Sequence, residues 1–93
     1  MKKTFSVGEI VQSMQGRDKE NLYLIYRITC DKIYLVNGDN KLITSPKVKN
    51  PNHIVSKNMI VESLRDKILQ GKTIFDAEVY SILKKFKQNL KGE

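Results

Sequence analysis

The residues of this chain best suited to binding chemistry lie in a short charged loop, Gly16-Arg17-Asp18-Lys19, between two strand-like segments. An arginine side chain is a planar fork of donors that can hold a phosphate through two bonds or stack on an exposed base. We therefore expect Arg17 to contact a polyanion, with the positive charge of Lys19 beside it. A salt bridge to Asp18 is the alternative role for Arg17. Gly16 shapes the turn, because only glycine freely adopts positive φ.

A second basic segment follows at residues 46–53. Lys47 and Lys49 alternate with Val48, so in an extended backbone both ammonium groups point the same way. That arrangement suits contact with two successive phosphates. Asn50 precedes a proline and is biased toward extended geometry. Its amide could read a base edge or bond its own loop.

Two further polar residues belong to this candidate face. Ser13, near the end of the first strand-like segment, could donate to a phosphate or satisfy a strand end. His53 is the single histidine. With no second ligand beside it, a structural hydrogen bond that closes the barrel is favoured over contact with a polyanion, and metal binding is not expected.

The charge distribution points to the same surface. The formal net charge is +7, from 17 basic and 10 acidic residues. No acid occurs between Asp39 and Glu62, where the sequence places Lys41, Lys47, Lys49 and Lys57. Basic surfaces attract polyanions, and nucleic acid gains further from counterion release. The alternative is a surface whose lysines serve solubility alone.

Length and composition limit the classes of function. A chain of 93 residues that is 40% hydrophobic predicts one ordinary globular domain with a small core and little room for a deep cleft. A single cysteine, Cys30, excludes an intrachain disulfide and favours a reducing, cytoplasmic location. No apolar run is long enough to span a bilayer, so we expect no membrane partner. We find no nucleotide loop, nucleophile with a base, or metal-ligand cluster, so we expect no enzyme, cofactor or small-molecule substrate.

The first half of the chain is typical of short antiparallel strands. Branched and aromatic residues separated by turns predict strands at 9–14, 22–29, 33–36 and 41–44. Asn37-Gly38 suits the tight turn before the last of these. Four short strands in about fifty residues favour a small, strongly curved barrel over residues 5–54. We expect Tyr23, Tyr26 and Tyr34 to pack in the sheet rather than stack on bases, with Tyr26 and Tyr34 as neighbours across a hairpin.

The second half has helical spacing. Ile60, Leu64 and Ile68 recur every four residues and predict a helix that ends at Gly71. Asp76 is placed to cap a second helix, whose apolar stripe consists of Val79, Leu83, Phe86 and Leu90. Its later turns carry Lys84, Lys85, Lys87 and Lys91, which we interpret as a solvated cationic face. The predicted fold is mainly β plus α: a barrel at 1–54, and a helical hairpin at 55–93 packed on it as one folding unit.

One residue pattern resembles a known family. The residues Phe5, Gly8, Ile10, Val11, Ser13 and Gly16-Arg17-Asp18, followed by the Tyr23 strand and by Pro46-Lys47-x-Lys49-Asn50-x-x-His53, resemble the bacterial KOW-domain RNA-binding proteins. These are similar in turn to a large-subunit ribosomal protein family of archaea and eukaryotes. The resemblance implies an SH3-like barrel whose loop around Gly16 contacts RNA, without cofactor or catalysis. Where many members carry arginine after the turn, this chain has Lys41, a point charge without the planar fork.

These observations predict a non-catalytic RNA-binding protein that contacts mainly the phosphate backbone of structured RNA, associated with the ribosome or translation. Contact with a ribosomal protein is a further expected partner. The alternative is a protein-interaction module that docks on a ribosomal or transcription component through the barrel or the helical hairpin. The exposure of the apolar stripe on the second helix discriminates between an RNA-binding protein and a protein-interaction module. If Val79, Phe86 and Leu90 remain exposed they favour a protein partner, and if they cover the barrel they leave the basic loops as the main candidate.

Overall fold

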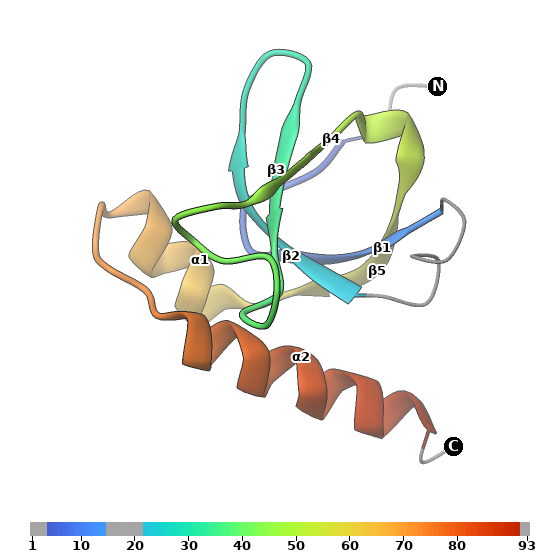
Figure 1. The fold of residues 1–93 in the computed structure, drawn as a ribbon, viewed down its shortest axis with the longest axis vertical. Helices are drawn as coiled ribbons and strands as arrows, with labels where there is room; N and C mark the ends of the chain where they lie inside the picture. Colours follow the sequence, from blue (N-terminus) through green and yellow to red (C-terminus); the bar gives the residue numbers. More distant parts are fainter. Residues whose placement is uncertain (1–3, 15–21, 92–93) are drawn as a thin grey trace.

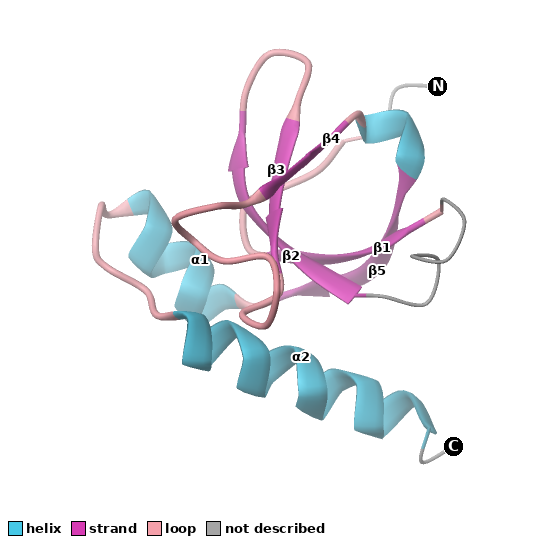
Figure 2. Cartoon of the chain, in the orientation of Figure 1, coloured by secondary structure: helices cyan, strands magenta, loops and turns pink. Residues whose placement is uncertain are grey.

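Five antiparallel strands form one curved sheet, and two helices pack against one of its faces (Figures 1 and 2). The computed structural model describes residues 4–14 and 22–91. The strands are β1 (Glu9–Ser13), β2 (Leu22–Ile28), β3 (Ile33–Val36), β4 (Lys47–Lys49) and β5 (Ile54–Ile60). A short 3-10 turn, η2 (Pro51–His53), precedes β5, and the helices are α1 (Glu62–Leu69) and α2 (Asp76–Lys91).

The predicted combination of an antiparallel sheet with helices is confirmed, and the sheet is open rather than closed into a barrel. The strand order is β4-β3-β2-β1-β5, so β4 and β5 are the two edges of an open sheet. The strands at 9–13, 22–28 and 33–36 lie where branched and aromatic residues predicted them. Only the turn η2 joins the two edge strands along the chain.

The predicted strand at 41–44 is a turn, and the fourth strand lies later, at β4. Side chains use the backbone donors of this segment. The Oδ1 atom of Asn37 accepts hydrogen bonds from the amides of Asp39 and Lys41, each at 2.9 Å. The amide of Ile43 donates to Oδ1 of Asp76 at 2.8 Å. With these donors engaged elsewhere, the segment does not add to the sheet.

Strand β5 was not predicted from the sequence. It pairs with β1 through Ser13 opposite Ile54 and Gln12 opposite Val55, so the sheet continues past residue 54, where the barrel was expected to end. Its second half is irregular, because the pairing shifts around Asn58, which has a φ of 58°. Helix α1 begins two residues after β5 ends.

Both faces of the sheet are buried. The interior cluster fills the concave face and consists of Val11, Tyr23, Ile25, Ile33, Leu35 and Ile54. The helix-side cluster joins the other face to the helices and consists of Ile10, Leu24, Val36, Leu64, Ile74, Val79 and Leu83. Because successive residues of a strand point to opposite faces, neighbouring apolar residues in β1, β2 and β3 supply one cluster each.

The tyrosines of β2 and β3 differ in how they pack. Tyr23 is buried in the interior cluster, which confirms core packing for that residue. The β2–β3 register shifts at Tyr26 and pairs Arg27, rather than Tyr26, with Tyr34. The guanidinium of Arg27 lies 6.0 Å from the Tyr34 ring centroid.

Helix α1 ends at Leu69, directly before the predicted stop at Gln70-Gly71. This glycine has a φ of 76°, and its amide donates to the carbonyl of Ile68 at 3.1 Å. The next amide, of Lys72, donates to the carbonyl of Lys67 at 2.8 Å. These two bonds satisfy carbonyls that the helix end would otherwise leave without partners.

Helix α2 begins differently from the prediction. The carboxylate of Asp76 accepts the amide of Ile43 across the fold, so it fastens the loop after β3 to the helix. The N-terminal amide of the helix is met by Glu78, whose Oε1 accepts the amide of Phe75 at 3.0 Å. This is one half of a capping box, in which a glutamate bonds back to the residue before the helix.

Within the described residues, neither helix is long and apolar enough to cross a membrane.

Candidate nucleic-acid interface

The two lysines of β4 lie on the same side of an edge strand. Lys47 pairs with Leu35 and Lys49 with Ile33, while Val48 between them is 47% exposed. The extended backbone predicted for this segment is thus confirmed. The ammonium of Lys47 lies 5.6 Å from the ring centroid of Tyr23, in the geometry of a cation–π contact. Both lysines are half-buried, so their stems cover the concave rim of the sheet.

The segment after β4 turns sharply at η2. Asn50 has the predicted extended backbone, with φ of −76° and ψ of 140°, and its Oδ1 accepts the amide of Asn52 at 2.9 Å. The side-chain amide of Asn50 could read a base edge or bond its own loop. Its oxygen bonds its own loop. Because this bond fixes the start of η2, it also fixes the direction in which the chain leaves Lys49.

His53 closes the sheet through its backbone. Its carbonyl accepts the amide of Met14 at 3.0 Å, and its own amide donates to the carbonyl of Asn50 at 2.9 Å. The structural hydrogen bond expected at this residue is therefore made by the main chain, while the side chain is exposed. The bond to Met14 also places η2 beside the point where the described part of β1 ends.

Ser13 does not lie on this surface. It is 1% exposed and pairs with Ile54, a member of the interior cluster. A hydroxyl with so little exposure is not placed to donate to a phosphate on the surface. We therefore remove Ser13 from the candidate interface.

Lys41 belongs to a different part of the molecule. Its amide donates to Asn37, and its carbonyl accepts the amides of Asn37 and Gly38 at 2.9 and 3.2 Å. This loop packs against α2, whereas Lys49 and η2 lie at the other end of β4 (Figure 1). The structure thus brings Lys47, Lys49, Asn50 and His53 together and separates Lys41 from them.

The predicted loop residues Gly16, Arg17 and Lys19 lie outside the described residues. The described chain stops at Met14 and resumes at Leu22, and these two ends belong to the adjacent strands β1 and β2. Because Met14 bonds to His53, the last described residue before this gap lies next to η2.

Among the described residues, the carboxylates of Glu9 and Asp31 bear on the charge of the sheet. Glu9 is only 7% exposed, and its Oε1 accepts the amide of Ser6 at 2.9 Å, so it presents little charge to the outside. The tip of the β2–β3 hairpin brings Asp31 to a hollow that it shares with Pro51. Lys32 lines the same hollow and offsets that charge.

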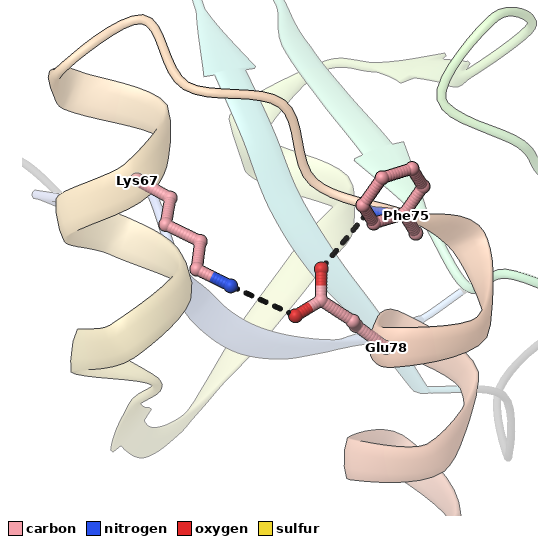
Figure 3. Close-up of polar contacts among 3 residues, drawn as sticks. All are labelled: Lys67, Phe75 and Glu78. Atoms are coloured by element: carbon pink, nitrogen blue, oxygen red, sulfur yellow. Dashed lines mark hydrogen bonds and ion pairs between the residues drawn. The ribbon is translucent and has the colours of Figure 1, made fainter.

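A carboxylate with a perturbed pKa lies elsewhere, between the helices (Figure 3). Glu78 Oε2 accepts from the ammonium of Lys67 at 2.9 Å, and its Oε1 accepts the Phe75 amide. The hydrogen bond from Lys67, and then that from Phe75, lower the pKa of Glu78 below its ordinary value. Oε2 thus joins α2 to α1 and Oε1 caps the start of α2, so both oxygens have a structural role.

Sequence reasoning missed a second group of side chains on α2. Tyr80, Lys84 and Lys87 line a cleft together with the loop after β3. Their i, i+4, i+7 spacing was available as a signal, because residues at this spacing share one helix face. Interpreting the lysines as a solvated face left out Tyr80, which lies one turn before Lys84.

The apolar stripe of α2 covers the sheet. Val79 is fully buried in the helix-side cluster, and Phe86 is half-buried against it. The side chain of Leu90 lies outside the described residues. The described residues of the stripe are therefore used in packing and do not form the exposed patch that would favour a protein partner.

Comparison with models of protein families gives no match for this chain, and comparison with curated proteins gives no significant one. Its function is therefore argued from the geometry above and from the residue pattern of its N-terminal half.

Proposed function

We propose that this chain is a non-catalytic, cytoplasmic RNA-binding protein that contacts mainly the phosphate backbone of structured RNA, associated with the ribosome or translation. The observation that carries the proposal is the pairing of Lys47 and Lys49 on one side of an edge strand that runs directly into the turn Asn50–His53. The sequence has no acid between Asp39 and Glu62, so this whole segment is electropositive or neutral. Phosphate is the ligand that such a surface most readily holds.

The proposal extends to the fold family. A sheet that curves around its own apolar cluster, with its edge strands joined by one 3-10 turn, supports an SH3-like barrel of the KOW type. The resemblance of the N-terminal half to KOW-domain proteins supports the same assignment. The resemblance also adds the loop with Arg17 to the proposed interface. It makes a ribosomal protein an expected binding partner.

The geometry supports backbone contact more than base reading. Lysine ammonium groups are point charges without the planar fork that reads a base edge. The carbonyl of the Asn50 side chain is already bonded within its loop. Binding of this kind is strongly salt-dependent and weakly sequence-dependent, because each phosphate contact releases condensed counterions.

The salt dependence of binding tests the proposal. The affinity for a short RNA hairpin is measured by fluorescence anisotropy at several salt concentrations, for the natural chain and for Lys47→Ala/Lys49→Ala. Each lost phosphate contact lowers the slope of log K against log salt by about 0.9 unit, so we expect the double variant to lose nearly two units. Adding Arg17→Ala should lower the slope further.

A matched control separates local contact from overall charge. Lys72→Ala/Lys85→Ala removes two exposed lysines away from β4 and gives the same net charge. This control should keep a slope within about half a unit of the natural chain. Equal slopes for the two double variants would show that net charge alone drives binding and would refute the interface. Crosslinking in cells, followed by sequencing of the attached RNA, identifies the target.

A protein-interaction module that docks on a ribosomal or transcription component is the second candidate. It is favoured by the open edge at β5, where Met59 is 47% exposed and Ile60 40%. Exposed apolar residues at an unpaired strand edge suit a protein partner. Recovery of a protein but no RNA in the crosslinking experiment would replace the first candidate with this one.

A further inference from the structure

A cleft of about 300 Å³ separates the loop after β3 from the exposed face of α2. Its polar lining comes from both sides and consists of Asn37, Asp39, Asn40, Tyr80, Lys84 and Lys87. Its apolar lining is Leu22 and Leu83. The cleft therefore combines an aromatic ring, two cations, a carboxylate and amide groups within one small volume.

The walls of this cleft are held in place by backbone packing. A Cβ atom at Gly38 would lie 2.7 Å from the Tyr80 nitrogen and 2.9 Å from its Cβ, so the loop backbone rests directly on the helix. Asp76 fastens the far end of the loop through the amide of Ile43. A ligand would thus meet a preformed site rather than one that must be assembled on binding.

The loop side offers defined polar groups. The Oδ1 atom of Asn37 accepts from two loop amides, and its Nδ2 donates to Oδ1 of Asn40 at 3.0 Å. Asn40 is exposed and has its own Nδ2 as the remaining donor, and Asp39 is exposed with a carboxylate as acceptor. The loop therefore presents one donor group and one acceptor group next to each other.

The helix side offers a ring and positive charge. Tyr80 is 45% exposed, and the ammonium of Lys84 lies 5.9 Å from its ring centroid. Lys87 lies one turn further along and is exposed. An exposed ring stacks on any base, and lysines next to it hold the attached phosphates.

We propose that this cleft binds an unpaired nucleotide of single-stranded RNA, with the base on Tyr80 and its phosphates at Lys84 and Lys87. This inference rests on the proposed RNA-binding function and adds a second contact site on α2. Asp39 accepts from an exocyclic amino group of the base, as carboxylates do from the amino group of cytosine. An acidic peptide fits less well, because its carboxylates are repelled by the carboxylate of Asp39.

The assignment predicts base preference. Adenine, cytosine and guanine carry an exocyclic amino group and uracil does not, so oligo(A) and oligo(C) should bind more tightly than oligo(U). Asp39→Ala should reduce that difference, since it removes the acceptor that distinguishes the bases. A backbone-only interface would not discriminate between them.

The experiment measures fluorescence anisotropy of labelled single-stranded oligo(A), oligo(C) and oligo(U) RNA with the full chain and with Tyr80→Ala. Alanine keeps the Cβ atom that packs near Gly38, so the loop contact is retained. We expect affinity for oligo(A) to fall roughly 5- to 150-fold, the loss that corresponds to one base–aromatic stack. Tyr80→Phe keeps the ring and should bind like the natural chain.

Phe75→Ala is the matched control, because Phe75 is 63% exposed next to the start of the same helix and outside the cleft. It should leave affinity unchanged. Adenosine monophosphate should also shift the NMR signals of the Asn40 side-chain amide in the natural chain and not in Tyr80→Ala.

The outcomes separate this inference from the proposed function. Unchanged oligo(A) binding by Tyr80→Ala, with weakened hairpin binding by Lys47→Ala/Lys49→Ala, would overturn the cleft and leave the β4 interface standing. Equal affinity for oligo(A) and oligo(U) would overturn the role of Asp39. An oligo-glutamate peptide that shifts the Asn40 signals as adenosine monophosphate does would overturn the nucleotide as ligand. Failure of the natural chain to bind any RNA would overturn both proposals.

Discussion

Two glycines with the same backbone conformation should respond very differently to a single methyl group. Gly38 and Gly71 have φ of 75° and 76°, a conformation that alanine adopts only at a cost. At Gly71 a Cβ atom would meet no other atom within 4 Å. At Gly38 it would collide with the carbonyl oxygen of Asp76 and lie 2.7 Å from the nitrogen of Tyr80.

The expected losses follow from these surroundings. The left-handed conformation costs alanine about 1 to 2 kcal/mol at either position. The smaller entropy of the unfolded alanine chain offsets this equally in both variants. At Gly38 the collision involves backbone atoms of a helix, which cannot rotate away, and such overpacking costs about 1 to 3 kcal/mol more. Gly38→Ala should therefore lose about 1 to 3 kcal/mol more unfolding free energy than Gly71→Ala, whose own loss is at most about 1 to 2 kcal/mol.

Urea unfolding followed by far-ultraviolet circular dichroism measures both losses, provided that the slope of free energy against urea is the same in the two variants. A domain of this size has about 5 to 15 kcal/mol of stability, so each variant should still fold. Equal losses in Gly38→Ala and Gly71→Ala would refute the close approach of the loop to α2, and with it the preformed wall of the cleft.

Three further predictions concern the packing of the helices. The pKa of Glu78 is held below its ordinary value of 4.5 by the hydrogen bond from Lys67. The contribution of Glu78 to stability is therefore present above that pH and is lost as the pH falls below it. Between about pH 6 and pH 3, the urea midpoint should fall more steeply for the natural chain than for Glu78→Gln. Leu64→Ala, at a site 1% exposed, should cost about 2 to 5 kcal/mol, whereas Leu69→Ala, at a site 61% exposed, should change thermal stability by no more than about 0.5 kcal/mol. Asp76→Ala leaves a loop amide without its acceptor and should cost about 1 to 3 kcal/mol in urea unfolding, and a similar cost for Asp76→Asn, which keeps an acceptor oxygen, would contradict this reading.

Local patterns predicted the parts of the fold that depend on nearby residues. The strands at 22–28 and 33–36 are dense in branched and aromatic residues, and Gly71 ends a helix because its own conformation permits it. The first part of α2 was predicted from its apolar spacing, and Val79 is buried as that spacing requires.

The parts that depend on distant partners were not predictable in the same way. Segment 41–44 looks like a strand, but Asp76, 33 residues after Ile43, takes its amide. Strand β5 has a polar middle, Ser-Lys-Asn, and forms because β1 offers an open edge more than forty residues earlier in the chain. In the candidate interface, the side of β4 that carries Lys47 and Lys49 followed from alternation alone. The burial of Ser13 depends on β5 and could not be foreseen without it.

The burial of apolar residues on both faces of the sheet has a consequence for how the strands find their alignment. In β1 and β2 the neighbouring pairs Ile10-Val11 and Leu24-Ile25 are both buried. Sliding one strand by a single position would therefore move apolar side chains from one face of the sheet to the other without exposing them to water. Hydrophobicity alone cannot identify the native alignment in the middle of these strands. The native alignment is instead specified by the buried polar residues at the two ends of β1, Glu9 and Ser13. If the strand slid by one position, the carboxylate of Glu9 would lose its hydrogen bond from the amide of Ser6.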